Sequence, residues 1–229
     1  MMTRRSTVAI GLLVTMSILE LSHPSWAGGS VSEGVATAGV WWIPLHLLLI
    51  TGYAVVVGML WPKAPIQRTL LALFAVCNTV FLGIDGVLVG LLARADPPAA
   101  DALWNSLAVS VLGNLTGASW AAALLALAVE LYPSRERSAA VVVESSLTWA
   151  AFVASSVIPL VGLISRVLAV AIGALAVQAT GRAGLPFALL VFAAVLHQHV
   201  GSEAALGMLC VAIAVTLRGR SVPVAASPP

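Results

Sequence analysis

Long apolar runs separated by short polar segments dominate the chain. Two of these runs, Thr69 to Ala93 and Leu103 to Leu131, are joined by a turn at Ala95-Asp96-Pro97-Pro98. At a helical rise of about 1.5 Å per residue, each run is long enough to cross a hydrocarbon layer of about 30 Å. The pattern therefore predicts a hairpin of two membrane-spanning helices.

Glycines spaced four residues apart give each helix of this hairpin one narrow face. Gly86 and Gly90 lie in the first helix, and Gly113 and Gly117 lie in the second. Small residues at this spacing let a neighbouring helix approach closely within a bilayer. We expect these four glycines to lie at contacts between helices.

Apolar runs continue on both sides of the hairpin. Val40 to Trp61 has tryptophans near both ends, as expected of a span between two membrane interfaces, and Ala139 to Leu163 is a further span. Three shorter apolar stretches follow, at residues 165–181, 184–200 and 204–217. Each lies at or below the low end of the range of about 17 to 25 residues that a spanning helix needs. The expected fold is an all-α, polytopic membrane bundle over residues 40–218, with seven spans, or six if one short stretch fails to cross.

The first 27 residues have the pattern of an export signal. Arg4 and Arg5 precede the apolar run Val8 to Leu19, and Ser25-Trp26-Ala27 offers small residues where a signal peptidase would cut. Glu20 interrupts the apolar run early, so an uncleaved anchor is the alternative. In both cases we expect residues 28–39 to be a mobile connector outside the cytoplasm.

Basic residues predict the orientation of the bundle. If the N-terminus is cytoplasmic, only Arg94 and Arg166 fall on the outer side. The cytoplasmic side then receives Lys63, Arg68, Arg135, Arg137, Arg182, Arg218 and Arg220. This distribution follows the excess of Lys and Arg in cytoplasmic loops. We expect a bacterial inner-membrane protein with a cytoplasmic C-terminus and a disordered tail at residues 219–229.

Composition agrees with the membrane class and disfavours others. Sixty per cent of the residues are hydrophobic and 9% are charged, compared with about 25% charged in soluble domains. The net charge of +2 includes no basic stripe interleaved with aromatic residues, so a nucleic-acid partner is not expected. The expected partners are the lipid bilayer and either further copies of the chain or a larger membrane complex.

Five polar residues in or near the predicted spans are candidates for a buried site or pathway: Asp85, His46, Asn114, His197 and Glu144. An aspartate at the centre of a membrane helix costs about 2.5–3.5 kcal/mol, so Asp85 is the strongest candidate. In the predicted topology all but Glu144 share the outer leaflet. The structural alternative is that Asp85 pairs with Asn114 or with a backbone group across the glycine faces and that His46 makes a hydrogen bond between helices. In the same alternative His197 is solvated near the membrane surface, and Glu144 extends toward water or pairs with neighbouring hydroxyl groups.

We expect no metal and no cofactor from the sequence. His197 and His199 are two residues apart, so they cannot reach the same ion from a regular helix. Zinc needs three or four protein ligands, and haem bound by His46 and His197 would need two facing imidazoles. There is no nucleotide-binding, metalloprotease or serine-hydrolase motif, and Lys63, the chain's lysine, lies in a loop where it could not hold retinal. An enzyme is not expected.

Two function classes remain open. The first is a small transporter or channel-like protein for a proton, an ion or a small solute, whose pathway passes Asp85. The second is a non-catalytic accessory or scaffold subunit of a larger membrane complex. Loss of flux on Asp85→Asn substitution would favour the first class, and an unaffected partner would favour the second.

Overall fold

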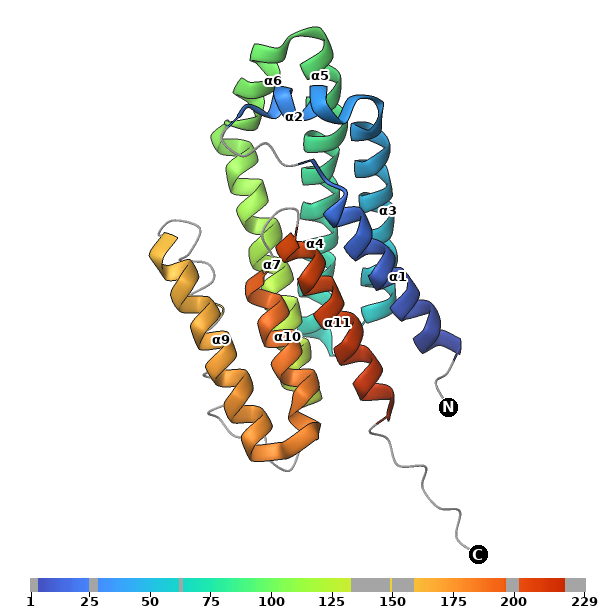
Figure 1. Cartoon of the computed structure of the whole chain (residues 1–229), viewed down its shortest axis with the longest axis vertical. Coiled ribbons are helices and arrows are strands. Elements are labelled where there is room, and N and C mark those ends of the chain that lie inside the picture. The colour runs from blue at the N-terminus through green and yellow to red at the C-terminus, as the bar shows by residue number, and fades with distance from the viewer. Residues whose placement is uncertain are drawn as a thin grey trace, which may run out of the picture.

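The computed structural model describes residues 4–24, 29–61, 64–132, 149, 159–196 and 202–220. Every regular element in these ranges is helical, which confirms the predicted all-α class. The elements are α1 (Arg4–Leu21), α2 (Val31–Ala38), η1 (Gly39–Trp41), α3 (Trp42–Leu60), α4 (Pro65–Leu82), η2 (Gly83–Val89), α5 (Gly90–Ala95), α6 (Pro97–Trp104), α7 (Leu107–Leu131), α9 (Pro159–Thr180), η3 (Gly181–Gly184), α10 (Leu185–Leu196) and α11 (Ser202–Arg220). They form an elongated bundle in which α1 lies beside α11 (Figure 1).

The predicted hairpin is present, with one difference at its turn. The continuous helical stretch Pro65–Ala95, made of α4, η2 and α5, returns through α7, and α4 packs along α7. The turn itself contains the short helix α6, whose first turn is capped by the Asp96 carboxylate. The Ser106 hydroxyl then accepts a hydrogen bond from the Val109 amide and caps α7, so the second long helix begins at Leu107 and not at Leu103.

The N-terminal helix α1 is part of the core. Leu13 and Met16 are buried, and Met16 fills the space beside Gly52 of α3, where any larger residue would collide with it. On the same face of α1, the Tyr53 hydroxyl donates a hydrogen bond of 2.7 Å to Glu20. Cleavage after Ala27 stays a prediction, and residues 25–28 lie outside the described ranges.

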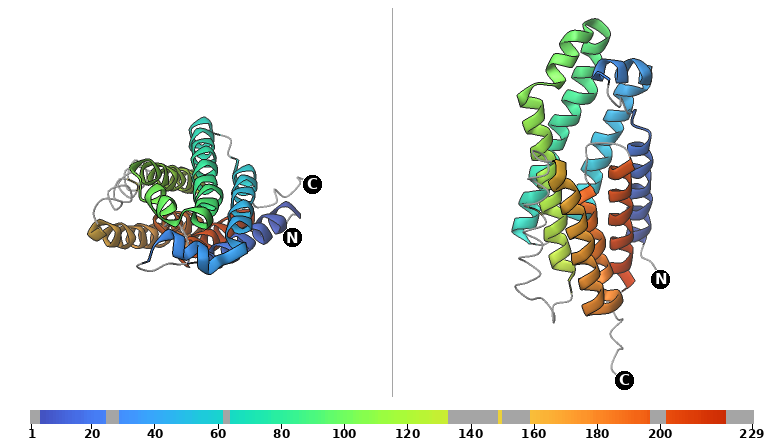
Figure 2. Two further views of the ribbon diagram at one scale, coloured as in Figure 1. Left: turned by 90° about the horizontal axis from the view of Figure 1, so that it is seen from above. Right: turned by 60° about the vertical axis from the view of Figure 1, so that its left-hand side comes forward.

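Part of the expected connector at residues 28–39 is the short helix α2, which lies across one end of the bundle (Figures 1 and 2). Its start carries a capping box: the Ser30 hydroxyl accepts from the Glu33 amide, and the Glu33 carboxylate accepts from the Ser30 amide. The helix ends at Gly39, whose φ of 56° few other residues adopt. Local capping thus orders a segment whose composition suggested a mobile linker.

A pair of hydrogen bonds ties α2 to α6. Asp101 accepts from the Ser32 amide at 3.0 Å and from the Ser32 hydroxyl at 2.8 Å. These bonds, led by the one from the backbone amide, hold the pKa of Asp101 below its ordinary value of 3.8. Beneath this contact, Val31, Val35 and Ala100 pack over Trp42. We call α2 and α6 together the cover.

Four helical stretches among the described residues are long and apolar enough to cross a membrane: Val31–Leu60, Pro65–Ala95, Leu107–Leu131 and Arg166–Leu196. The last is bent at η3, so that α9 and α10 run side by side as a hairpin (Figure 1). Shorter apolar helices span Thr7–Leu21 and Ser202–Leu217. The count of seven spans stays a prediction.

Candidate functional site

Three polar side chains from three separate elements meet beneath the cover. His23 follows the end of α1, His46 lies one turn inside α3, and Asp85 lies in η2. The His46 Nε2 atom is 3.1 Å from Asp85 Oδ2 and 3.1 Å from His23 Nε2. His46 and Asp85 are fully buried, and His23 is 6% exposed. We call these residues the His23–His46–Asp85 cluster.

The approach of η2 and the start of α5 to α3 depends on two glycines, Gly86 and Gly90. A Cβ atom added at Gly86 would collide with the Cβ atom of His46. A Cβ atom added at Gly90 would lie 2.8 Å from the Trp42 ring. The backbone of η2 therefore lies directly on the face of α3 that carries Trp42 and His46. The same segment has π-helical hydrogen bonding, a local widening that is frequent at functional sites.

Trp42 supports the cluster from the start of α3. Its indole N–H donates a hydrogen bond of 3.1 Å to the Asp85 carbonyl oxygen, which fixes the backbone of η2 at the residue whose side chain faces His46. The indole ring also packs against both imidazoles, with centroid distances of 5.2 Å to His23 and 4.7 Å to His46. Trp42 is itself fully buried.

A backbone carbonyl oxygen lies within hydrogen-bonding distance of Nδ1 in both imidazoles. His46 Nδ1 lies 2.8 Å from the Trp42 carbonyl oxygen, and His23 Nδ1 lies 3.0 Å from that of Pro24. A carbonyl oxygen can only accept, so in each neutral ring the hydrogen is assigned to Nδ1. Each Nε2 atom then carries a lone pair, and these two atoms face each other.

The cluster therefore directs three electron-pair donors at one buried place: two imidazole nitrogens and a carboxylate oxygen. All three residues offer ligand atoms that lie within 4.8 Å of one another. Two lone pairs at 3.1 Å repel unless a proton or a metal ion lies between them. Such an arrangement can accept a proton or a metal ion.

In comparisons with protein-family models, with curated proteins and with solved structures, no match to this chain is found.

The structure brings together only some of the residues singled out from the sequence. His46 and Asp85 are in contact, whereas the side chain of Asn114 is exposed on α7 and does not share their buried site. The expected pairing of Asp85 with Asn114 is thus replaced by a contact with His46. Glu144 and His197 lie outside the described residues.

The glycines of the second hairpin helix have a different neighbour from those of the first. A Cβ atom at Gly113 would lie 3.1 Å from the Phe81 ring of α4, so this glycine faces the other helix of the hairpin. Gly117 is half-buried on α7. By contrast, Gly86 and Gly90 face α3, so the two glycine pairs serve two different contacts.

Sequence reasoning missed His23, the third member of the cluster. This residue falls within the segment that resembles an export signal, which removed it from the list of ligands. A usable signal was present, because His23 follows α1 at the same end of the bundle from which His46 enters α3. Glu20 was missed for the same reason, and with it the contact that it makes with Tyr53.

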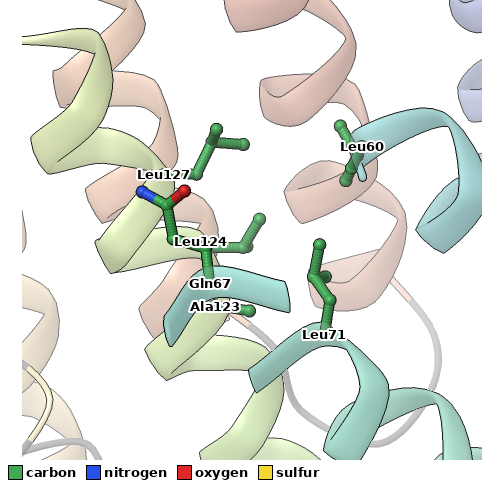
Figure 3. A pocket seen from close by; sticks show the side chains of 6 residues that line it. All are labelled: Leu60, Gln67, Leu71, Ala123, Leu124 and Leu127. Atoms are coloured by element: carbon green, nitrogen blue, oxygen red, sulfur yellow. The ribbon is translucent and has the colours of Figure 1, made fainter. Parts of the chain in front are cut away.

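A small pocket lies between α3, α4 and α7 and is an ordinary packing defect of the bundle (Figure 3). Its volume of about 10 Å³ is room for about one water molecule, and it is lined by Leu60, Gln67, Leu71, Ala123, Leu124 and Leu127. The Gln67 amide donates to the Ala126 carbonyl oxygen and is the polar member of the lining. No convergent set of ligand atoms lies among these six residues.

Proposed function

We propose that the protein is a small, multi-pass bacterial inner-membrane protein that carries a cation across the bilayer, with the His23–His46–Asp85 cluster as the binding position on its pathway. The observation that carries the proposal is the convergence of three buried electron-pair donors. Buried ionisable groups in membrane proteins are expensive and commonly mark an ion or substrate pathway.

The arrangement of the helices supports the orientation expected from the basic residues. The start of α1, the α9–α10 turn and the end of α11 lie at one end of the bundle, and the cover lies at the other (Figure 1). Arg182 belongs to the α9–α10 turn, whereas Arg94 lies next to the cover. A cytoplasmic N-terminus places Arg182 inside and Arg94 outside, in agreement with the excess of basic residues in cytoplasmic loops. The cluster then lies in the outer half of the bilayer.

Flux in proteoliposomes tests the proposal. The full chain is reconstituted into vesicles loaded with either a fluorescent zinc indicator or a pH indicator, and uptake is followed after addition of Zn²⁺ or of an acid pulse. We expect Asp85→Asn to lower the flux about tenfold or more, because the substitution removes the negative charge that stabilises the bound cation.

The matched control is Thr51→Val, on the exposed side of the same helix as His46. It should leave the flux unchanged. Equal flux in wild-type, Asp85→Asn and empty vesicles would refute the transport proposal.

A second candidate function is an accessory subunit that packs against a larger membrane complex. The specific observation is an open apolar groove of about 550 Å³ between α9 and α10, lined in part by the small residues Gly173, Ala174 and Ala188. Small residues of this kind favour helix association in bilayers. This alternative predicts a partner that co-purifies from native membranes and is retained in the Asp85→Asn protein.

A further inference from the structure

We propose that the cation bound by the His23–His46–Asp85 cluster is a divalent first-row transition-metal ion, held by Nε2 of both histidines and by the Asp85 carboxylate. The inference rests on the proposed function in taking the cluster as a cation site. It goes further in naming the chemical class of the ion and its ligands.

The first argument concerns the ligand types. Imidazole nitrogens suit zinc, copper, iron and nickel, whereas calcium and magnesium prefer sites made of oxygen atoms. Two imidazoles and one carboxylate make a set that zinc sites use. One proton can occupy only one of the contacts around His46 Nε2 at a time, whereas a metal ion can accept all three electron pairs together.

The second argument concerns distances. In a tetrahedral zinc site with bonds of about 2.0–2.1 Å, neighbouring ligand atoms lie about 3.3 Å apart. The two contacts of His46 Nε2, to His23 Nε2 and to Asp85 Oδ2, are both 3.1 Å. Two edges of a coordination tetrahedron are therefore formed already. The remaining edge, between His23 and the Asp85 carboxylate, is at most 4.8 Å long and shortens when the ion binds.

The third argument concerns the groups behind the ligands. A metal-binding histidine usually donates its other ring N–H to a carbonyl or carboxylate, which orients the ring. Both histidines of the cluster do this, to the carbonyl oxygens of Trp42 and Pro24. The Trp42 indole in turn donates to the backbone of Asp85. Both histidine rings are thus oriented by backbone carbonyls, and the backbone of the residue that carries the carboxylate is held by Trp42.

Three protein ligands leave a fourth position for water or for an exchanging ligand. Structural zinc sites are usually closed by four protein ligands, whereas open sites have three. The ion is therefore held in a site from which it can leave, as the proposed function requires.

The site also requires the N-terminal helix to remain in the mature protein. Cleavage after Ala27 would remove His23 together with α1, and α1 packs on α3 through Met16 and Glu20. We therefore infer that α1 is an uncleaved anchor. Intact-mass measurement of the protein purified from membranes through a C-terminal tag should show residues 1–27 still attached.

Metal binding to the purified full chain tests the proposal directly. The chelator-stripped protein in detergent is dialysed against Zn²⁺ and its metal content is measured; Co²⁺ replaces Zn²⁺ for visible spectroscopy. We expect one equivalent of Zn²⁺ and the intense visible bands of tetrahedral Co²⁺. His23→Gln, His46→Gln and Asp85→Asn should each weaken binding about 100-fold or more, and Trp42→Phe should weaken it about 10–100-fold.

A substitution that keeps a metal ligand at position 23 distinguishes the loss of a ligand from the loss of the fold. His23→Cys supplies another zinc ligand at the same position, so it should restore binding that His23→Gln abolishes, and its Co²⁺ form should gain a sulfur-to-cobalt charge-transfer band. Thr51→Val should bind like the wild type. Failure of the cysteine variant to bind, with the folded helical content retained, would count against His23 as a ligand.

The outcomes separate this inference from the proposed function. Stoichiometric zinc binding without flux keeps the metal site and refutes transport. Asp85-dependent proton flux without binding of Zn²⁺ or Co²⁺ keeps transport and overturns the metal inference. Binding that is unchanged in all three ligand variants, or a mature chain that begins after Ala27, also overturns it.

Discussion

Two buried acids face the same side of α3, and they differ in the chemistry opposite them. Asp85 faces His46, whose Nε2 is an electron-pair donor in the tautomer set by the Trp42 carbonyl. Glu20 faces Tyr53, about two turns farther along, and accepts its hydroxyl hydrogen. In the Glu20 contact the Tyr53 hydroxyl supplies the hydrogen, whereas in the Asp85 contact the proposed site places a cation between the two side chains. Burial of an acid does not by itself mark a site; the group opposite it decides.

The largest effect is expected for a substitution that disturbs the packing of η2, which carries Asp85, against α3. Gly86→Ala places a Cβ atom against the Cβ of His46, which is rooted in the α3 backbone and cannot swing aside. We expect η2 to be pushed from α3, with a loss of about 3 kcal/mol in the free energy of unfolding and with loss of zinc binding. Thermal unfolding in detergent and metal content measure the two effects.

Gly58→Ala is the matched control for that substitution. Gly58 is on the same helix as His46, and an added Cβ atom would have nothing within 4 Å. Alanine there should leave binding unchanged and raise stability slightly, since glycine inside a helix costs about 1 kcal/mol relative to alanine. Equal behaviour of Gly86→Ala and Gly58→Ala would contradict the close contact of η2 with α3.

Removing the hydrogen bond between Tyr53 and Glu20 should lower the stability of the protein but leave metal binding unchanged. Tyr53→Phe removes the hydroxyl that donates to Glu20 Oε1, and Glu20 Oε2 already makes no hydrogen bond within the described residues. We expect a loss of about 1–2 kcal/mol, because a buried polar group is left unsatisfied. Zinc affinity should stay at the wild-type value. A variant that loses zinc binding but keeps its stability would show that Glu20, and not only Asp85, belongs to the cation site.

The smallest effect is expected at the cover. Asp101 has a lowered pKa in the folded protein, so its contribution to stability is fully present above its ordinary pKa of 3.8 and is lost as the pH falls through the lowered value. Acidification should therefore release α2 from α6 and expose the Ser32 amide to hydrogen exchange.

Asp101→Asn keeps one oxygen acceptor but cannot titrate. In this variant, hydrogen exchange at the Ser32 amide should follow only the intrinsic effect of pH. The additional loss of protection that acid causes in the wild type should be absent. If the wild type and this variant show the same pH dependence, then Asp101 is not the group that holds the cover in place.

The sequence was sufficient for the helices and for part of the site. Long apolar runs predict helices because a membrane interior leaves the backbone few other ways to satisfy its hydrogen bonds. Asp85 was singled out by its cost in hydrocarbon, and it lies in the cluster. The capping box at Ser30 and Glu33 could have predicted α2, but the glycine content of the segment outweighed it.

The direction in which side chains face could not be predicted. Lipid and the protein interior are both apolar, so α7 shows no polar face that would separate buried Thr116 from exposed Asn114. The same ambiguity hid the partner of Gly86 and Gly90, which is α3 and not the other helix of the hairpin. His23 was hidden by a different cause, because a short apolar helix with basic residues before it has the pattern of both an export signal and a packed first helix.

The contact of α1 with α11 has a consequence for how the chain is made. These helices lie side by side although they are the first and the last described helices of the sequence (Figures 1 and 2). During synthesis α1 leaves the ribosome long before α11 is translated. The face of α1 that contacts α11 therefore lacks this neighbour until α11 has been made. A chain that stops before α11 would hold every proposed metal ligand and still lack the helix that packs along α1.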